Sequence, residues 1–164
     1  MRFLLFILAL LFTIASCKKD SVAGVSVEMY LLKSYSLVPG KCQVDAGSTT
    51  LQTIPFIKNE DIIEYSRINY TYKLTDTSFQ KINTVWSGQA FAVTVDKQVI
   101  FYGIFKPSIS SSSCEHSVTM DFNSQTDHTI ILHLGYPNGS ASGTSDQRNN
   151  ATILNALRAQ GKLR

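Results

Sequence analysis

The sequence predicts a single α+β domain, in which an antiparallel or mixed sheet carries helices packed on one face. Several segments alternate apolar and polar residues, with the period of two that is typical of half-buried strands. Residues 76–86 instead repeat apolar side chains every three or four positions, as an amphipathic helix does. Because consecutive strand segments follow one another across short turns, antiparallel neighbours and an α+β arrangement are expected.

The composition supports one folded core. The chain has 164 residues, of which 44% are hydrophobic and 16% charged, so extended disorder is not expected. The net charge is only +3, and no stretch places basic residues among aromatic ones. This excludes a nucleic-acid binder that neutralises many phosphates. No internal repeat or second domain is evident, so residues 25–164 are expected to form one globular domain.

The first part of this domain is expected to contain strands separated by irregular segments. Residues 25–32 alternate and predict the first strand, and residues 49–54 predict a short strand after a loop. Asn59 is expected to cap a short helix over residues 60–66, where two acidic residues suit the N-terminal end of a helix. Residues 70–74 alternate again and predict another strand.

The middle of the chain predicts a helix followed by a hairpin. Thr75 is a good N-cap for a helix over residues 76–86. Two apolar segments, residues 90–95 and 98–105, flank the two-residue turn Asp96-Lys97, so a hairpin is expected. Because both segments are apolar on both faces, we expect their strands at the centre of the sheet.

The last part predicts two strands, a loop and a helix. Residues 117–122 and 129–134 are the strand segments. Residues 137–149 are rich in glycine, serine and asparagine, which indicates a surface loop. Asn149 or Asn150 is expected to cap a final amphipathic helix that a glycine ends.

The N-terminus predicts export and a lipid anchor. An unbroken apolar run over residues 3–12 is too short to cross a ~30 Å hydrocarbon core and is typical of a signal peptide. The following Ile14-Ala15-Ser16-Cys17 resembles a bacterial lipobox, in which the cysteine receives a diacylglyceryl group. Residues 1–16 are then a lipoprotein signal peptide, and residues 17–24 a lipidated tether. The alternative is an ordinary signal peptide cleaved near Ser16.

The residues around Cys17 also indicate a location. Ser16-Cys17-Lys18-Lys19-Asp20 is similar to the start of many small lipoproteins of Bacteroidota-type bacteria. A lysine rather than an aspartate after the cysteine implies, by analogy with such proteins, the outer membrane rather than the inner one. Each buried methylene contributes about 0.8 kcal/mol, so two or three acyl chains such as palmitate hold a protein stably on a bilayer. The domain would face the periplasm or the cell surface.

Two further cysteines, Cys42 and Cys114, form an even pair in a compartment where disulfides persist, and a disulfide between them is expected. The bridge would close a loop of roughly 70 residues, for which the chain-entropy model gives about 4 kcal/mol of stabilisation. Two separate buried thiols are the alternative, because sequence alone does not place their Cα atoms within bonding distance.

One segment in the middle of the chain resembles a known family. Residues 74–79, Leu-Thr-Asp-Thr-Ser-Phe, and residues 88–100, which run from Gly-Gln-Ala-Phe through Val-Asp to Val-Ile, resemble the first periplasmic domain of the SecD secretion subunit. In that family a strand ending in Leu-Thr-Asp leads into a helix, and a glycine precedes an apolar strand ending in Val-Asp. The similarity covers residues 60–105, under a third of the chain. It implies a local βαββ arrangement and no function or site.

The residues that carry chemistry form no recognisable reactive constellation. His116, His128 and His133 are the only histidines, and with Cys114 their spacing does not supply the four ligands of structural zinc. Nucleophile elbows, calcium loops and phosphate loops are not found in the sequence. The sequence therefore predicts no catalytic residue, no metal site and no cofactor.

Three functions remain as hypotheses. The first is a non-enzymatic binding domain, held on the membrane by its lipid anchor, whose partner is a protein, a peptide or a glycan. The alternatives are an envelope enzyme with residues scattered over loops and a purely structural envelope component. The lack of a reactive constellation favours binding over catalysis, whereas no residue separates binding from a structural role.

We expect any binding surface on two loops, residues 108–113 and residues 136–147. The hairpin strands should be covered, so loops are where polar and aromatic groups meet a partner. Ser110, Ser112 and Asn138 offer adaptable hydrogen bonding around one aromatic anchor, Tyr136. Two unconstrained loops without a binding role are the alternative.

Overall fold

The computed structural model describes residues 25–123, 127–137, 139, 141 and 143–164. The predicted signal peptide, residues 1–16, the lipidation candidate Cys17 with its tether, residues 17–24, and the binding candidate Asn138 lie outside the described residues. In the described part, the strands are β1 (Val27–Ser34), β2 (Thr50–Leu51), β3 (Ile62–Ser66), β4 (Thr71–Leu74), β5 (Ala90–Val95), β6 (Gln98–Phe105), β7 (Cys114–Asn123) and β8 (Thr129–Tyr136). The helices are α1 (Asp76–Ile82) and α2 (Ala151–Ala159), with two short 3-10 helices, Ala46–Ser48 and Asn59–Asp61.

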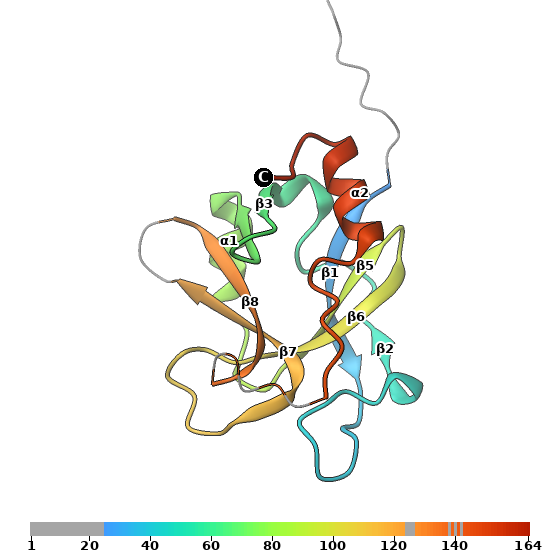
Figure 1. The fold of residues 1–164 in the computed structure, drawn as a ribbon, viewed down its shortest axis with the longest axis vertical. Helices are drawn as coiled ribbons and strands as arrows, with labels where there is room; N and C mark the ends of the chain where they lie inside the picture. Colours follow the sequence, from blue (N-terminus) through green and yellow to red (C-terminus); the bar gives the residue numbers. More distant parts are fainter. Residues whose placement is uncertain (1–24, 124–126, 138, 140, 142) are drawn as a thin grey trace, which may run out of the picture.

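The strands form one mixed sheet. Its order is β2-β1-β5-β6-β7-β8-β4-β3, and every neighbouring pair is antiparallel except β6 and β7, which run parallel. Figure 1 shows that the sheet bends, with β8 on one side of the molecule and β1 and β5 on the other. The expected mixed sheet is therefore found, although strands outweigh helices and the fold is mainly β.

Other segments pair with the outer strand β3 and with the stretch of β1 that β2 does not reach. Along β1, the Met29 amide donates to the Ile57 carbonyl at 2.9 Å, and the Phe56 amide donates to the Met29 carbonyl at 2.8 Å. Along β3, the Tyr65 amide donates to the Lys162 carbonyl and the Arg164 amide to the Tyr65 carbonyl, both at 2.8 Å. These bonds satisfy backbone groups that an edge strand otherwise offers to other chains.

The central hairpin is confirmed. Asp96 and Lys97 adopt φ angles of 49° and 66°, the pair of left-handed conformations that a type I′ turn requires. The Asp96 carboxylate accepts a hydrogen bond from the Ser26 amide at 2.7 Å, which ties the turn to the start of β1. All of β5 is buried, as expected of a central strand with both faces covered.

The predicted helix over residues 60–66 is wrong. Only the 3-10 turn Asn59–Asp61 is helical, and the chain then continues as β3. Ile62 and Tyr65 are buried against the core while β3 pairs with β4, so tertiary packing outweighs the local helix signal. Asn59 does not cap a helix, because its side-chain oxygen accepts from the Val27 amide at 2.9 Å.

Both helices begin after the residues predicted to cap them, but the Thr75 side chain makes no capping hydrogen bond and α1 is shorter than expected. It begins after Thr75 and ends at Ile82, so Trp86 lies outside it and is 67% exposed instead of completing an apolar helix face. In α2, the Asn150 side chain accepts from the Thr152 amide at 2.9 Å and so caps the helix as predicted. No helix in the described residues is long and apolar enough to cross a bilayer.

The apolar interior has two parts on opposite faces of β5. The main core gathers side chains from most strands and the buried side chains of both helices, including Phe79 of α1 and Ile153 of α2. Phe91 and Val93 of β5 point into it, whereas Ala90 and Ala92 belong to a smaller cluster that also includes Val44 and Cys114. The loop between β1 and β2 thus covers the other face of the sheet.

Candidate functional site

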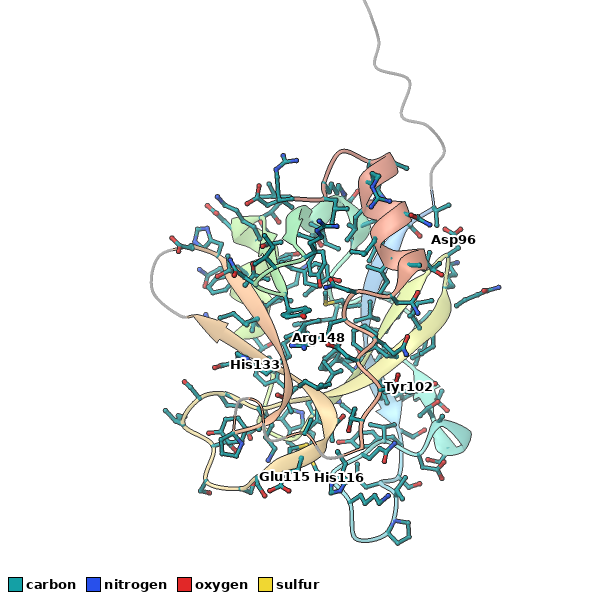
Figure 2. The ribbon with its side chains drawn as sticks, in the orientation of Figure 1. Asp96, Tyr102, Glu115, His116, His133 and Arg148 are labelled. Atoms are coloured by element: carbon teal, nitrogen blue, oxygen red, sulfur yellow. A yellow bond between two sulfur atoms is a disulfide. The ribbon has the colours of Figure 1, made fainter. Side chains whose placement is uncertain are left out.

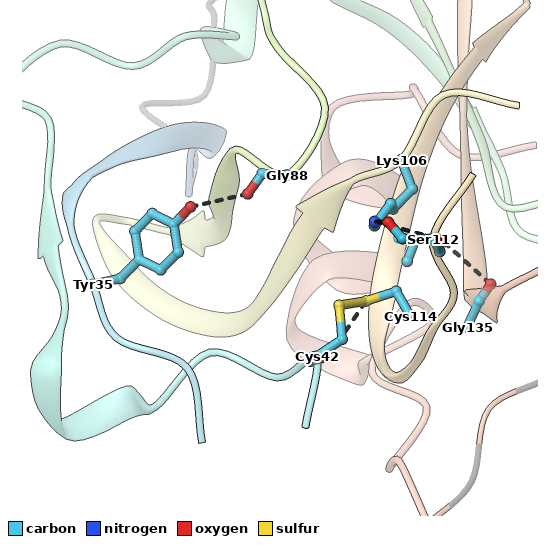
Figure 3. The surroundings of a disulfide bond; sticks show 8 residues. Tyr35, Cys42, Gly88, Lys106, Ser112, Cys114 and Gly135 are labelled. Carbon is cyan, nitrogen blue, oxygen red and sulfur yellow. Dashed lines mark hydrogen bonds between the residues drawn. A yellow bond between two sulfur atoms is a disulfide. The ribbon is translucent and has the colours of Figure 1, made fainter. Parts of the chain in front are cut away.

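A disulfide between Cys42 and Cys114 confirms the expected pairing, with Cα atoms 5.0 Å apart. Figure 3 shows how the bridge joins the loop between β1 and β2 to the first residue of β7. The loop is also folded on itself, since Leu37 and Val44 form an antiparallel bridge. The loop between β1 and β2 is therefore held covalently against β7.

The parallel ladder between β6 and β7 is short. It pairs Gly103, Ile104 and Phe105 with Val118, Thr119 and Met120. Gly103 allows this close approach, because a Cβ there would lie 2.8 Å from the Val118 carbonyl oxygen and closer still to the ring of Phe91. The pairing of β7 with β8 is irregular between Cys114 and Val118. Val118 is the first residue of β7 that pairs with β6, and His116 and Ser117 before it line a hollow together with Phe101 and Tyr102 of β6.

We name this feature the His116 hollow, and its volume is about 370 Å³. It is lined by Gln43 and Val44 from the disulfide loop, Tyr102 from β6, His116 and Ser117 from β7, and Thr144 from the loop before α2. A smaller adjoining hollow of about 280 Å³ shares His116 and is lined by Cys42, Ser113 and Glu115. Figure 2 shows Glu115 and His116 together at one end of the molecule, with Tyr102 further along the same side. His116 thus stands between the two hollows.

The chemistry of the His116 hollow is that of hydrogen bonding. The Tyr102 hydroxyl lies 2.9 Å from the Thr49 hydroxyl, which fixes the orientation of the phenol at the hollow. Hydroxyl, amide and imidazole groups from three segments line its walls. In the described part of the chain, no hydrogen bond or ion pair joins His116 to a carboxylate. The arrangement can donate to and accept from a polar ligand.

Arg148 positions the loop that supplies Thr144. Its guanidinium lies 3.6 Å from the centre of the Tyr70 ring, and it donates to the Leu132 carbonyl at 3.0 Å. The same group forms two hydrogen bonds to the Asp146 carboxylate, at 2.7 and 2.9 Å. The bonds from Arg148 hold the pKa of Asp146 below its usual value, despite an opposing effect of burial. Figure 2 shows Arg148 in the middle of the molecule.

The predicted binding loops meet through Tyr136. This side chain is half-buried, and its hydroxyl donates to the carbonyls of Ser108 and Ser110, both at 2.9 Å. Ser112 accepts hydrogen bonds from the buried Lys106 ammonium at its hydroxyl, 2.7 Å, and its carbonyl, 3.3 Å. The ends of both loops reach the hollows, one with Ser113 and the other with Thr144 and Ser145.

The three histidines lie in different surroundings. His128 directly precedes β8 and places its Nδ1 2.8 Å from a carboxylate oxygen of Asp76. His133 is half-buried on β8, and this burial lowers its pKa. Among the residues that the structure describes, no group of three or more histidine, cysteine, aspartate or glutamate side chains is placed to hold a metal ion.

Sequence reasoning did not identify the lining residues of the His116 hollow. It weighed His116 as a metal ligand or a surface or turn histidine, and Tyr102 as a residue of sheet packing or of a binding surface, without bringing the two together. No local signal marks either one, because the hollow results from a parallel pairing between strands and from a loop that reaches them through the disulfide. Comparisons of the chain with protein-family models, with curated proteins and with solved structures find no match.

Proposed function

We propose that the protein is a lipid-anchored domain of the bacterial cell envelope that binds a protein, peptide or glycan partner, and that the partner binds at the His116 hollow. The observation that supports the proposal most strongly is that two walls of the hollow are held in place by other parts of the fold. One wall is fixed by the Cys42–Cys114 disulfide and another by the contacts of Arg148. Walls held in place before binding lower the conformational cost of capturing a ligand.

The lining of the hollow favours recognition rather than catalysis. Side chains that donate and accept hydrogen bonds surround a concave surface that also has apolar atoms from Val44 and Phe101. A few polar groups placed around a partly apolar hollow are typical of binding sites. Of the two predicted loops, residues 136–147 supply Thr144 and Ser145 to this hollow, and residues 108–113 reach the adjoining hollow through Ser113. The Tyr136 hydroxyl holds residues 108–110 in place by donating to the carbonyls of Ser108 and Ser110.

The lipid anchor is supported by the lipobox and by the position of the fold. β1 begins at Val27, ten residues after Cys17, so a diacylglyceryl group on Cys17 is compatible with an intact sheet. Two or more acyl chains would hold the domain stably on a bilayer. We place it at the outer membrane, facing the periplasm or the cell surface.

The arrangement of the helices belongs to the same proposal. Both α1 and α2 contribute buried side chains to the main core rather than to the smaller cluster. This supports an arrangement in which the helices cover one face of the sheet. The His116 hollow is lined from both sides of the sheet, since Val44 and Tyr102 belong with the smaller cluster and Phe101 and Val118 with the main core.

The binding role is tested by filling the hollow. In a Thr144→Trp variant, an indole at the rim would obstruct the space beside His116. The control is Ile68→Trp, since Ile68 is 79% exposed and does not line the hollow. Each purified chain is immobilised and exposed to a detergent-solubilised envelope extract. We expect the wild type and Ile68→Trp to retain the same partner and Thr144→Trp to lose it. Equal retention by all three chains would place the site elsewhere, and no retention by any would favour a structural role.

A further inference from the structure

A third hollow, which we name the Trp86 hollow, lies at the C-terminal end of β1, beside the only tryptophan of the chain. Its volume is about 420 Å³, and it shares no lining residue with the His116 hollow. Trp86 stands at this hollow with 67% of its surface exposed. The indole presents a large, flat apolar surface beside a concave region whose other lining residues are mostly polar, so it can contact a ligand bound there.

The backbone that carries Trp86 is held in place from three directions. The Tyr35 hydroxyl donates to the Gly88 carbonyl at 2.9 Å, as Figure 3 shows. The Gly88 amide donates to the Phe105 carbonyl at 2.8 Å. The amide nitrogen of the Gln89 side chain donates to the Leu32 carbonyl at 3.1 Å. The turn is therefore anchored to both β1 and β6, and the indole is presented from a fixed support.

Polar side chains surround the indole. Lys33 and Gln52 are exposed, and each lines the hollow from a different strand or loop beside Trp86. Tyr35 and Gln89 also line the hollow, together with Leu32 and Ser34 of β1, and the Gln89 amide is oriented by its bond to β1. One aromatic face is thus combined with two side-chain amides, a phenol and an ammonium group.

We propose that the Trp86 hollow binds a glycan. A pyranose ring has an apolar face of C–H groups that can lie on an indole, and a rim of hydroxyls that both donate and accept hydrogen bonds. Amide groups match such hydroxyls because they also do both, and the Lys33 ammonium donates only. The hollow is shallow and mixed in character, which suits a sugar better than the side chain of an apolar peptide, and this site is independent of the His116 hollow.

The single tryptophan makes the test direct, because all indole fluorescence of the protein comes from this site. The purified full chain is titrated with hexasaccharides of glucose, of mannose and of N-acetylglucosamine, and with an acidic and a basic hexapeptide. We expect a saturable change in tryptophan fluorescence with at least one hexasaccharide. If no hexasaccharide changes the fluorescence, or if only a peptide does, the proposal is wrong.

Variants then locate the binding by calorimetry, with folding checked by circular dichroism. We expect Trp86→Ala to weaken the hexasaccharide at least tenfold, Trp86→Phe to keep part of the affinity, and Gln52→Ala to weaken it about threefold. Ile68→Ala removes another exposed apolar side chain, which lines neither this hollow nor the His116 hollow, and should leave the affinity unchanged. A folded Trp86→Ala that binds as tightly as the wild type would overturn the proposal, whatever the fate of the proposed function.

Discussion

Arg148 and Gly103 each act on one wall of the His116 hollow. Arg148 is 9% exposed and holds the loop before α2 through Asp146, Tyr70 and the Leu132 carbonyl. Gly103 lets β6 and β7 approach where their ladder begins, next to the point at which they separate. Both effects can be measured as changes in the free energy of unfolding.

Replacing Asp146 should make stability less sensitive to acid. Arg148 lowers the pKa of the Asp146 carboxyl in the folded protein, so the unfolded state binds the proton more readily. This contribution is present above the unfolded pKa, about 3.9, and is lost as the pH falls through the lower folded value. Urea unfolding at pH 7, 5, 4 and 3 should therefore show a smaller acid loss for Asp146→Asn than for the wild type. Parallel pH profiles would contradict this assignment.

Gly103→Ala should destabilise the sheet. The new methyl group would overlap the Phe91 ring and the Val118 carbonyl oxygen, which belongs to the backbone and cannot move without disturbing the ladder. Overpacking of this kind costs about 1–3 kcal/mol. The control is Gly47→Ala, where a Cβ meets only a carboxylate oxygen of Asp45 at 3.5 Å. Denaturant unfolding should show the loss for Gly103→Ala alone, and equal stabilities would argue against the close β6–β7 contact.

The roles of Gly103 and Arg148 could not be predicted from the sequence. Gly103 is one glycine in an apolar strand, and only its parallel neighbour reveals why it has no side chain. Arg148 lies in a loop whose sequence indicates a polar surface segment, yet it contacts the Leu132 carbonyl of β8 and the ring of Tyr70, the residue before β4. The disulfide between Cys42 and Cys114 could be predicted from the sequence, because two cysteines in a domain expected to be exported tend to pair.

At the scale of elements, local sequence patterns predicted a helix or strand correctly where contacts with distant segments favour the same structure. The alternating hairpin strands and the Asn150 cap needed no distant partner to be recognised. Residues 60–66 combine acidic residues with Ile62, Ile63 and Tyr65, and pairing with β4 decides between helix and strand. The apolar period of α1 likewise extends past its end, because Trp86 lies at a surface hollow instead of facing the core.

The disulfide loop is the element whose loss should have the largest effect on stability. Replacing both Cys42 and Cys114 by serine releases the loop that covers the outer face of β5. Removing a native disulfide from a small exported domain typically costs about 2–5 kcal/mol. Thermal and denaturant unfolding of the double variant should show a loss in this range. A double variant as stable as the wild type would mean that Val44 and its neighbours hold the loop without the bridge.

At the scale of the whole molecule, we propose a membrane anchor joined to a folded binding domain. The outer strand β3 is paired with C-terminal residues, and the His116 and Trp86 hollows share no lining residue. In this proposal the fold holds the binding surfaces in place, while a lipid on Cys17 sets where they act. The proposed anchor and the proposed binding site are tested separately.

The anchor is tested by Cys17→Ala. Without a thiol the chain cannot receive a diacylglyceryl group, so we expect export without stable membrane attachment. Cell fractionation with detection of the protein in membrane and soluble fractions measures the effect, and metabolic labelling with a palmitate analogue should mark the wild type alone. A Cys17→Ala chain that stays wholly in the membrane fraction would contradict lipidation at this residue.

Photo-crosslinking in living cells tests most directly whether a partner binds at the His116 hollow. A photoreactive phenylalanine derivative is placed at Thr144, on the rim of the His116 hollow, and in a control at Ile68, which lines neither hollow. If a partner binds at the His116 hollow, irradiation should give one discrete adduct with the Thr144 chain and none with the Ile68 chain. The Thr144 adduct should be lost when His116→Ala and Tyr102→Phe are added. An adduct at Ile68 alone, or no adduct at Thr144, would contradict a partner bound at the His116 hollow.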